Sequence, residues 1–357
     1  MNLPKISFGL LVLNGEPFIK YNLHAIYPFA YQIIIVEGAS IYAKKIADGK
    51  GHSNDGSLET LKRFQQIEDP QHKIIIVTAE DEGHPDGFWT EKDEMSNAYV
   101  KRSTGDYIWQ VDIDEFYLPQ DMSKICDILL SQPDIHVVEF PMLTFWGGLN
   151  YIIDGFFLKI FKTYRIFKWR KGYRYIKHRP PTIVDENGLD IRNKGTLKSP
   201  VLKKKKIYLY HYDTLLPNQA CQKTEYYGNV SWANNSFKNI NQWLEYGYKT
   251  LKWKYHPHIV DKYPSWLLRY NGVHPPQIEN MFQDILNGKI TGIKIRNIDD
   301  IEEILHSRLY NFNCKVLTAI SFLIKIFYPF INFIKFFFIK KGSYHSFYLL
   351  KNSNDLK

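Results

Sequence analysis

The chain has 357 residues, of which 45% are hydrophobic and 23% charged. These values exclude a disordered or fibrous protein and allow a full hydrophobic core. A formal net charge of +9 favours an anionic partner: nucleic acid, an acidic membrane surface or a phosphorylated ligand. Three widely spaced cysteines without metal-ligand spacing favour free thiols in a reducing compartment.

The first third of the chain alternates strand-like and helix-like segments. Two of the strand-like segments are continuous runs of isoleucine and valine, which are typical of parallel strands covered on both faces by helices. Apolar residues at helical spacing predict the helices between them. The predicted strands are Ile6–Leu13, Gln32–Val36, Lys73–Thr78 and Asp106–Val111, and the predicted helices are Ser57–Gln66, Glu91–Arg102 and a segment that begins near Pro17.

Acidic residues cluster directly after the fourth predicted strand, at Asp112, Asp114 and Glu115. Because strand side chains alternate between faces, Asp112 and Asp114 are predicted to point the same way. Two adjacent carboxylates repel each other unless a cation lies between them. Mg²⁺ or Mn²⁺ fits this requirement and leaves positions for phosphate oxygens. The alternative interpretation is a solvated turn that carries acids by chance.

The carboxyl ends of parallel strands are where α/β sheets bind ligands. Asn14, Glu37 and the Asp112/Asp114 pair all follow predicted strands, so we expect them at one edge of the sheet. A carboxylate such as that of Glu37 can accept hydrogen bonds from a base or a ribose. It can equally serve as a turn or helix-capping acid.

Four segments follow one another along the chain: Val12–Ile19, Ile33–Ser40, Ser53–Thr60 and Asp112–Pro119. In this order they resemble the nucleotide-sugar glycosyltransferases of the GT-A fold, particularly family-2-like enzymes. They fall within roughly residues 6–120, and the last has an Asp-x-Asp-Glu-Phe form. The resemblance implies an α/β fold with a Rossmann-like, mostly parallel mixed sheet flanked by helices. It also implies sugar transfer from a nucleotide sugar to a glycan or lipid-linked acceptor, in cell-surface polysaccharide or glycolipid biosynthesis.

The resemblance assigns roles to two sets of residues. The metal, Mn²⁺ or Mg²⁺, would act as a Lewis acid on the leaving nucleoside diphosphate. Lys92 can alternatively be an ordinary solvated lysine on a helix. His211 follows a predicted strand, Ile207–Tyr210, and its position there can alternatively be due to chance. The implied donor-binding residues are Asn14, Glu37, Asp55, Lys92 and Asp112, and the implied metal ligands are Asp112, Asp114 and His211.

Two features depart from the family pattern. The acidic-glycine-serine signature is split between Glu37–Ser40 and Ser53–Gly56. In addition, no helical acidic pair is recognisable as the catalytic base that an inverting enzyme needs, so the base and the stereochemistry are left open. The acidic residues considered for the base, none with a distinguishing context, are Glu139, Asp154, Asp185 and Glu186.

The C-terminal part has a different character. Loops and antiparallel strands are expected beyond residue 140, and mostly helices from Pro217 to Tyr310. Within 316–339 the polar residues form one stripe at helical spacing, which predicts an amphipathic helix on a membrane surface. A helix packed on the protein's own core and a true membrane span are the alternatives. The stripe consists of Thr318, Ser321, Lys325, Tyr328, Asn332 and Lys335.

These patterns predict a glycosyltransferase domain, a helical extension, a membrane-associated helix and a tail. No signal peptide is recognisable at the N-terminus, so we expect a cytoplasmic protein that is peripheral or monotopic on the inner face of the membrane. The expected boundaries are 1–215, with a nucleotide-sugar half at 1–120 and an acceptor and metal half at 121–215, then 216–312, 313–341 and 342–357.

Two other functions are considered. A non-catalytic membrane-associated binding protein would not require Asp112 and Asp114. A metal-dependent phosphatase would carry the acidic pair after its first strand with a hydroxyl nearby, where this chain has Phe116. A nucleotidyl transfer enzyme lacks support because no glycine-rich basic loop is present to bind a triphosphate. An acidic cluster at a sheet edge is also unsuited to nucleic acid, so none is expected as a partner.

Overall fold

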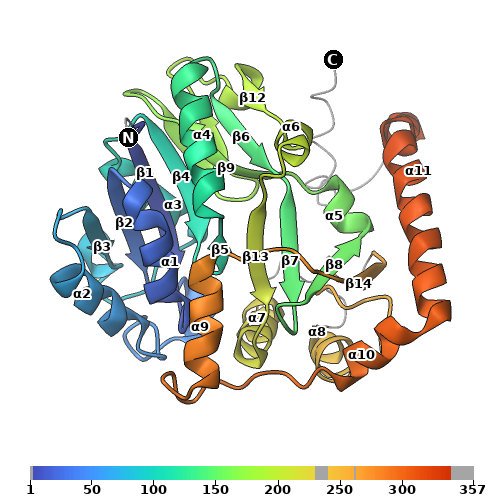
Figure 1. The fold of residues 1–357 in the computed structure, drawn as a ribbon. Helices are drawn as coiled ribbons and strands as arrows, with labels where there is room; N and C mark the ends of the chain where they lie inside the picture. Colours follow the sequence, from blue (N-terminus) through green and yellow to red (C-terminus); the bar gives the residue numbers. More distant parts are fainter. Residues whose placement is uncertain (1–2, 230–239, 261–262, 339–357) are drawn as a thin grey trace.

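The computed structural model describes residues 3–229, 240–260 and 263–338. Its centre is a seven-stranded sheet of order β12-β6-β9-β4-β1-β2-β3 (Figure 1). The four strands from the first third of the chain are parallel to one another, and β9 runs antiparallel between β4 and β6. The strands are β1 (Ile6–Val12), β2 (Gln32–Glu37), β3 (Ile74–Val77), β4 (Tyr107–Asp112), β6 (Val137–Phe140), β9 (Thr163–Lys168) and β12 (Thr196–Leu197).

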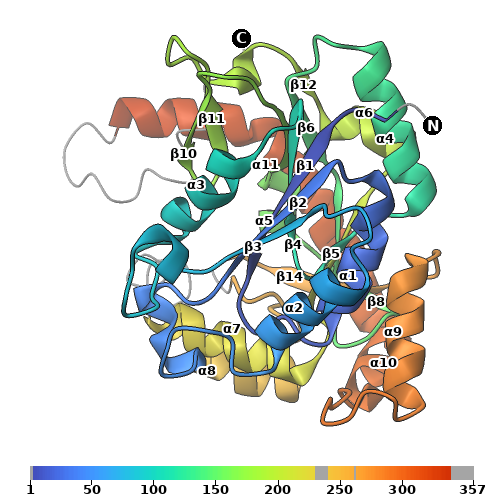
Figure 2. The same ribbon diagram turned by 90° about the vertical axis from the view of Figure 1, so that its left-hand side faces the viewer.

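Helices cover both faces of this sheet. Ile33 and Ile35 of β2 face a core shared with α1, α2 and α4, whereas Ile34 and Val36 face a core shared with α3 and the β10–β11 hairpin. Figure 2 shows α3 and this hairpin to the left of the sheet and α4 to its right. Burial of both strand faces explains the unbroken apolar runs. The elements are α1 (Phe18–Ile26), α2 (Ser57–Ile67), α3 (Lys92–Arg102), α4 (Pro119–Ser131), β10 (Arg174–Lys177) and β11 (Thr182–Val184).

A second, five-stranded sheet has the order β14-β8-β7-β13-β5. Its strand β5 begins directly after the acidic turn that follows β4, and β13 pairs with β5 on one side and with β7 on the other. The second sheet therefore brings late parts of the chain to the carboxyl end of β4. Its strands are β5 (Glu115–Phe116), β7 (Met142–Trp146), β8 (Tyr151–Gly155), β13 (Leu209–Thr214) and β14 (Ser265–Arg269).

Of the remaining helices, α6 packs on β6 of the central sheet, most of the others lie around the second sheet, and α9 returns to pack on α1, where the Tyr21 hydroxyl donates to Asp284 Oδ2 at 2.7 Å. A π-helical segment, Trp243–Lys249, follows α8, and short 3₁₀ segments occur at Tyr27–Phe29, Ile41–Ile46, Glu80–Glu82 and Ile191–Asn193. The helices are α5 (Phe156–Ile160), α6 (Ser199–Lys204), α7 (Pro217–Asn229), α8 (Ile240–Gln242), α9 (Pro276–Leu286), α10 (Asp299–His306) and α11 (Arg308–Phe338).

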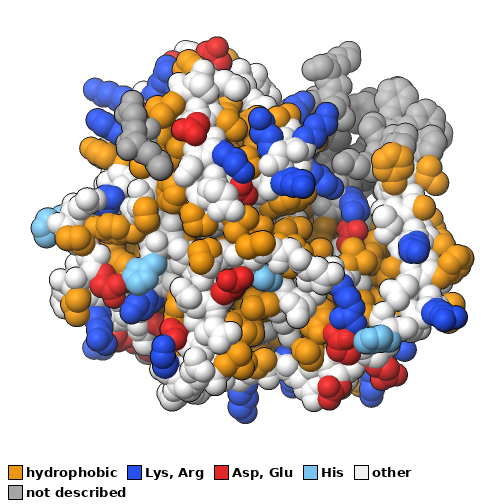
Figure 3. All heavy atoms as spheres, in the orientation of Figure 1, with side chains coloured by type: hydrophobic (Ala, Val, Ile, Leu, Met, Phe, Trp, Pro, Cys, Tyr) orange, Lys and Arg blue, Asp and Glu red, His pale blue; other side chains and the backbone are white. Residues whose placement is uncertain are grey.

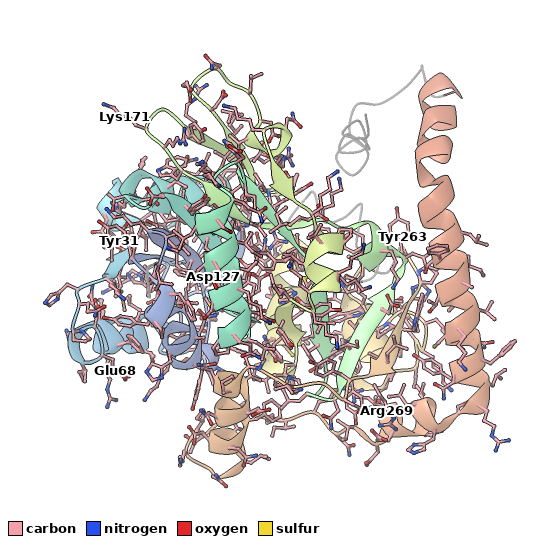
Figure 4. All side chains as sticks on the ribbon, turned by 45° about the horizontal axis from the view of Figure 1, so that its top comes forward. Tyr31, Glu68, Asp127, Lys171, Tyr263 and Arg269 are labelled. Atoms are coloured by element: carbon pink, nitrogen blue, oxygen red, sulfur yellow. The ribbon has the colours of Figure 1, made fainter. Side chains whose placement is uncertain are left out.

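An ion pair ties α10 to the second sheet. Arg269 of β14, labelled in Figure 4, places Nη2 2.5 Å from Glu302 Oε2, and the Tyr151 hydroxyl donates to the same carboxylate. Helix α11 follows α10 at the side of the molecule (Figure 1) and contacts α5 and β8. Among the residues that the structure describes, no helix combines the length and the apolar character needed to cross a bilayer.

The predicted fold class is confirmed: a mixed, mostly parallel sheet flanked by helices, with a helical C-terminal region. Two details differ from expectation. Strand β13 extends to Thr214, so His211 lies within the strand and not after it. Strand β14 lies in the part expected to be mostly helical and pairs with β8, because that edge of the sheet offers unpaired backbone groups. The predicted domain boundaries stay predictions, and the tail 342–357 and residues 339–341 lie outside the described residues.

Candidate functional site

The carboxyl ends of β1, β2 and β4 meet at one edge of the central sheet. Val12 pairs with Glu37 across β1 and β2, and Leu11 pairs with Asp112 across β1 and β4. Asn14 is the second residue after the end of β1. The sheet edge predicted from the sequence therefore exists, with the acidic turn at its centre.

Strand β13 runs alongside this acidic turn. His211 pairs with Glu115 of β5, and the Tyr212 backbone N–H donates to the Asp114 carbonyl at 2.8 Å. Along β13 the side chains alternate, so that Tyr210 and Tyr212 are buried while His211 and Asp213 are half-buried. Two backbone contacts thus place an imidazole and a further carboxylate beside Asp114.

Asp114, His211 and Asp213 form a group with the donors of a metal site. His211 Nε2 lies 3.5 Å from Asp114 Oδ1 and 3.6 Å from Asp213 Oδ1, and the ligand atoms of the three residues lie within 4.8 Å of one another. One imidazole and two carboxylates suit Mn²⁺, since nitrogen and oxygen ligands are both acceptable to it. The buried Nδ1 of His211 has no hydrogen-bond partner among the described residues. The residues present fit a divalent cation.

Asp112 has a different partner from Asp114. Strand β4 ends at Asp112, so Asp114 lies in the turn, and the alternation expected for a continuous strand does not apply. Arg165 of β9 places Nη2 3.2 Å from Asp112 Oδ2 and 2.5 Å from Glu115 Oε1. Burial raises the pKa of Asp112, but Arg165 and Arg179 outweigh burial and hold that pKa well below its ordinary value. Asp112 is therefore a carboxylate anchored by arginine.

Lys223 of α7 contacts the metal-type group. Its Nζ lies 3.3 Å from Asp114 Oδ2 and also donates to Asp213 Oδ1. Burial raises the pKa of Asp213, but Lys223 and His211 outweigh burial and leave the pKa lowered. Burial lowers the pKa of His211, and Asp114 and Asp213 reverse this and raise it. Both carboxylates are thus held in their charged form.

Further cations lie close to these acids. Lys92, the first residue of α3, stacks its Nζ 4.5 Å from the centre of the Tyr226 ring on α7. Burial lowers the pKa of Lys92, and Arg179 lowers it further. Asp112 and Lys223 also act electrostatically on Lys92. The structure therefore brings the side chain of Lys92, at the start of α3, close enough to Asp112 for the two charges to interact.

The other implied donor-binding residues have partners within the chain. The Glu37 carboxylate is fully buried and accepts the Ser53 N–H at 2.8 Å and a hydrogen bond with His52 Nδ1 at 2.9 Å. Asn14 Oδ1 accepts the N–H of Asn54. Asp55 accepts N–H groups of Glu16 and Ser57. These contacts hold the 52–57 segment against the sheet edge, and a donor-binding role for the three residues stays a prediction.

Of the four acidic residues considered for the catalytic base, three have partners in other parts of the chain and one is exposed. Glu186 is exposed in the loop after β11. Within the described part of the chain, no hydrogen bond or ion pair joins any of the four to Asp112, Asp114 or His211. The catalytic base stays unassigned. The partners of the other three are Ser199 for Glu139, Lys159 for Asp154 and Lys194 for Asp185.

Sequence reasoning missed several residues of this site, among them Asp213, Arg165, Lys223 and Arg179. Asp213 was recognisable, because it stands two residues after His211 and strand alternation puts both on one face. Arg165 and Lys223 carry no local signal, since only the pairing of β9 with β4 and the return of α7 over β13 bring them in. His258 also lies close enough to Asp213 and His211 to interact electrostatically, and burial lowers its pKa to about 4.

Comparisons with known proteins give fold-level similarities only. No family model matches the chain, and no curated protein matches it. Among solved structures, the chain is similar to TarS of S. aureus, with 14% identity over 39% of this chain and 36% of that chain and a TM-score of 0.29. It is also similar to the mannosyltransferase PcManGT from Pyrobaculum calidifontis, with 11% identity over 68% of this chain and 70% of that chain and a TM-score of 0.38.

A third similarity is to glucosyl-3-phosphoglycerate synthase from Mycobacterium tuberculosis, with 19% identity over 40% of this chain and 44% of that chain and a TM-score of 0.27. The chain thus spans only 36% of the solved TarS chain, which comprises residues 1–349, and 44% of the synthase chain. The PcManGT structure contains GDP-Man and Mn²⁺, and the synthase structure contains Mn²⁺ and uridine diphosphate. Similarity at this level carries no function over to this chain.

Proposed function

We propose that this chain transfers a sugar from a nucleotide-sugar donor, with a divalent metal bound by Asp114, His211 and Asp213. The observation that carries the proposal is the close approach of one imidazole and two carboxylates at the ligand-binding edge of a mostly parallel sheet. The four sequence segments that resemble GT-A glycosyltransferases surround the same edge and support it.

The charges around the site suit a diphosphate. Lys92 and Arg179 interact electrostatically with Asp112, and Lys223 contacts Asp114, so a diphosphate bound beside these acids would have both cationic side chains and a metal as partners. A bound Mn²⁺ or Mg²⁺ would supply Lewis-acid stabilisation of the leaving nucleoside diphosphate. Arg165 would keep Asp112 charged and in place. The base that activates the acceptor is not part of the proposal.

Titration of the purified chain with a panel of nucleotide sugars, with and without Mn²⁺, tests this function. We expect at least one donor to bind only when the metal is present and to release nucleoside diphosphate slowly, because water can replace the acceptor. Chelation with EDTA should reverse the binding. Failure of every donor to bind with either Mn²⁺ or Mg²⁺ would refute the proposal.

We further propose that α11 docks on an anionic membrane surface, which would bring the site to a lipid-linked or nascent glycan acceptor on the cytoplasmic face. One side of α11 packs on the protein through Tyr310, Cys314 and Leu317. The opposite side exposes an apolar stripe, visible as orange side chains at the right-hand edge in Figure 3. The exposed stripe consists of Leu309, Phe312, Val316, Ile320 and Leu323.

The positive charge beside this stripe favours an anionic bilayer as its binding partner. Arg308 and Lys315 are exposed on α11 beside it, as expected for an interfacial helix. Of the predicted polar stripe, Ser321 is buried and Thr318 is exposed, so these two residues do not share one environment. The sequence remains rich in isoleucine and phenylalanine through residue 338.

Vesicle sedimentation measures this contact. The full chain should sediment with phosphatidylserine-containing vesicles, and much less with phosphatidylcholine alone, because the basic residues need anionic headgroups. The double variant Phe312→Glu/Val316→Glu should lose most of the binding, since two charges would enter the acyl boundary. Asn311→Glu, an exposed polar position on the same helix, is the control for added charge. Equal sedimentation of both variants would contradict membrane docking.

A further inference from the structure

Lys223 contacts both carboxylates of the candidate metal site. Its Nζ is 3.3 Å from Asp114 Oδ2 and donates to Asp213 Oδ1, the same oxygen that lies 3.6 Å from His211 Nε2. A metal bound to Asp114 and Asp213 would bring a double positive charge next to this ammonium group. The attraction that now holds Lys223 would then be replaced by repulsion.

Lys223 has room and reason to move. Its side chain is 24% exposed and has a flexible four-carbon stem. Lys92 interacts electrostatically with both Arg179 and Lys223, and these cations would attract a diphosphate. The oxygens of that diphosphate would be new hydrogen-bond acceptors for Lys223. We infer that Lys223 is an internal counter-cation of Asp114 and Asp213 that passes to the diphosphate when the metal enters. The inference rests on the proposed function.

This exchange couples the two ligands. Without a diphosphate, the metal must displace Lys223 from two carboxylates and leave the lysine without an anionic partner. With a diphosphate present, the displaced lysine gains one. Metal and nucleoside diphosphate should therefore bind with positive cooperativity, and each should tighten the other by the same factor. A lysine that simply stabilised the fold would not produce this coupling.

Binding measurements on the full chain test the inference without any need for turnover. Electron paramagnetic resonance reports free Mn²⁺, and calorimetry reports the binding of UDP and GDP as probes, with protein-free blanks for Mn²⁺–nucleotide complexes. In the unmodified chain, we expect weak Mn²⁺ binding that UDP or GDP tightens. In Lys223→Met, Mn²⁺ alone should bind about tenfold more tightly, and the added effect of the nucleotide should shrink.

A matched control removes a different lysine that forms an ion pair with a residue of α7. Lys45 Nζ lies 3.7 Å from Glu225 Oε1 on the surface, so Lys45→Met should behave like the unmodified chain. Lys223→Gln, which retains a donor for Asp213, is a second neutral variant if the methionine variant does not fold. Circular dichroism checks the fold of each variant before titration.

The outcomes separate the inference from the proposed function. If nucleotide-dependent Mn²⁺ binding occurs but the neutral Lys223 variants bind Mn²⁺ alone no better than the unmodified chain, the inference is wrong and the function stands. If UDP or GDP binds equally well without metal and binding disappears in the Lys223 variants, the lysine replaces the metal permanently, which also overturns the inference. If no nucleotide promotes Mn²⁺ binding in any variant, the proposed function fails with it.

Discussion

Asp114→Ala should abolish metal-dependent donor binding and lower the rate of donor turnover at least about 100-fold. The variant removes one of three clustered metal donors, and the Lewis-acid contribution of a metal amounts to several kcal/mol, of which about 1.4 kcal/mol corresponds to a factor of ten. Mn²⁺ titration and the release of nucleoside diphosphate from the donor that binds measure the two effects.

A matched carboxylate provides the control for Asp114→Ala. Asp127 is an exposed aspartate on α4, labelled in Figure 4, and Asp127→Ala should retain the binding and turnover of the unmodified chain. Thermal unfolding followed by circular dichroism establishes that Asp114→Ala is folded. Turnover within a few-fold of the unmodified chain, in a folded variant, would exclude Asp114 as a metal ligand.

Arg165→Gln should lower the free energy of unfolding by about 3–5 kcal/mol, because removal of one partner leaves buried charges unpaired. Arg165 is the shared partner of Asp112 and of Glu115, whose side chain is 0% exposed. Urea unfolding of the metal-free protein measures the loss. Arg269→Gln removes a comparable pair at the surface, where the arginine is 39% exposed, and should cost about 1 kcal/mol or less. Equal losses for both variants would contradict the importance of burial.

The destabilisation by Arg165→Gln should also depend on pH. The pKa of Asp112 is lowered in the folded state, so its charged form contributes stability above its unfolded value of about 4, and this contribution is lost as the pH falls. Burial raises the pKa of Glu115, so acid neutralises the group that the variant leaves unpaired. The difference in stability between the two proteins should therefore be larger near pH 7 than near pH 3.

Local patterns were sufficient for the central sheet. In the structure the run Ile33–Val36 is buried on both faces, and the run Ile74–Val77, at the edge of the sheet, is buried at its ends and half-buried at Ile75 and Ile76. Such runs are typical of parallel strands with helices on both faces. The acidic turn after β4 was recognisable for the same reason, since polar residues directly after a buried strand must lie at a sheet edge. His211 was expected beside Asp114 only through the family resemblance, and the structure brings the two together.

Other parts of the site depend on long-range pairing. Arg165 reaches Asp112 because β9 lies antiparallel between β4 and β6. Nothing in the local sequence of β4 or of β9 indicates that these two strands pair. Lys223 reaches Asp114 across 109 positions of chain because α7 turns back over β13 (Figure 1). Strand β14 completes the second sheet from within a region whose composition favoured helix.

The sequence by itself determined which segments are buried, the parallel orientation of the first strands and the presence of carboxylates at their ends, because burial and alternation are local properties of a chain. Only the tertiary structure decided which cation serves which carboxylate: Arg165 for Asp112, and Lys223 with His211 for Asp114. The reason is physical. A charge in a partly buried site is stabilised by whichever opposite charge the fold brings within about 4 Å, and sequence distance does not enter that energy.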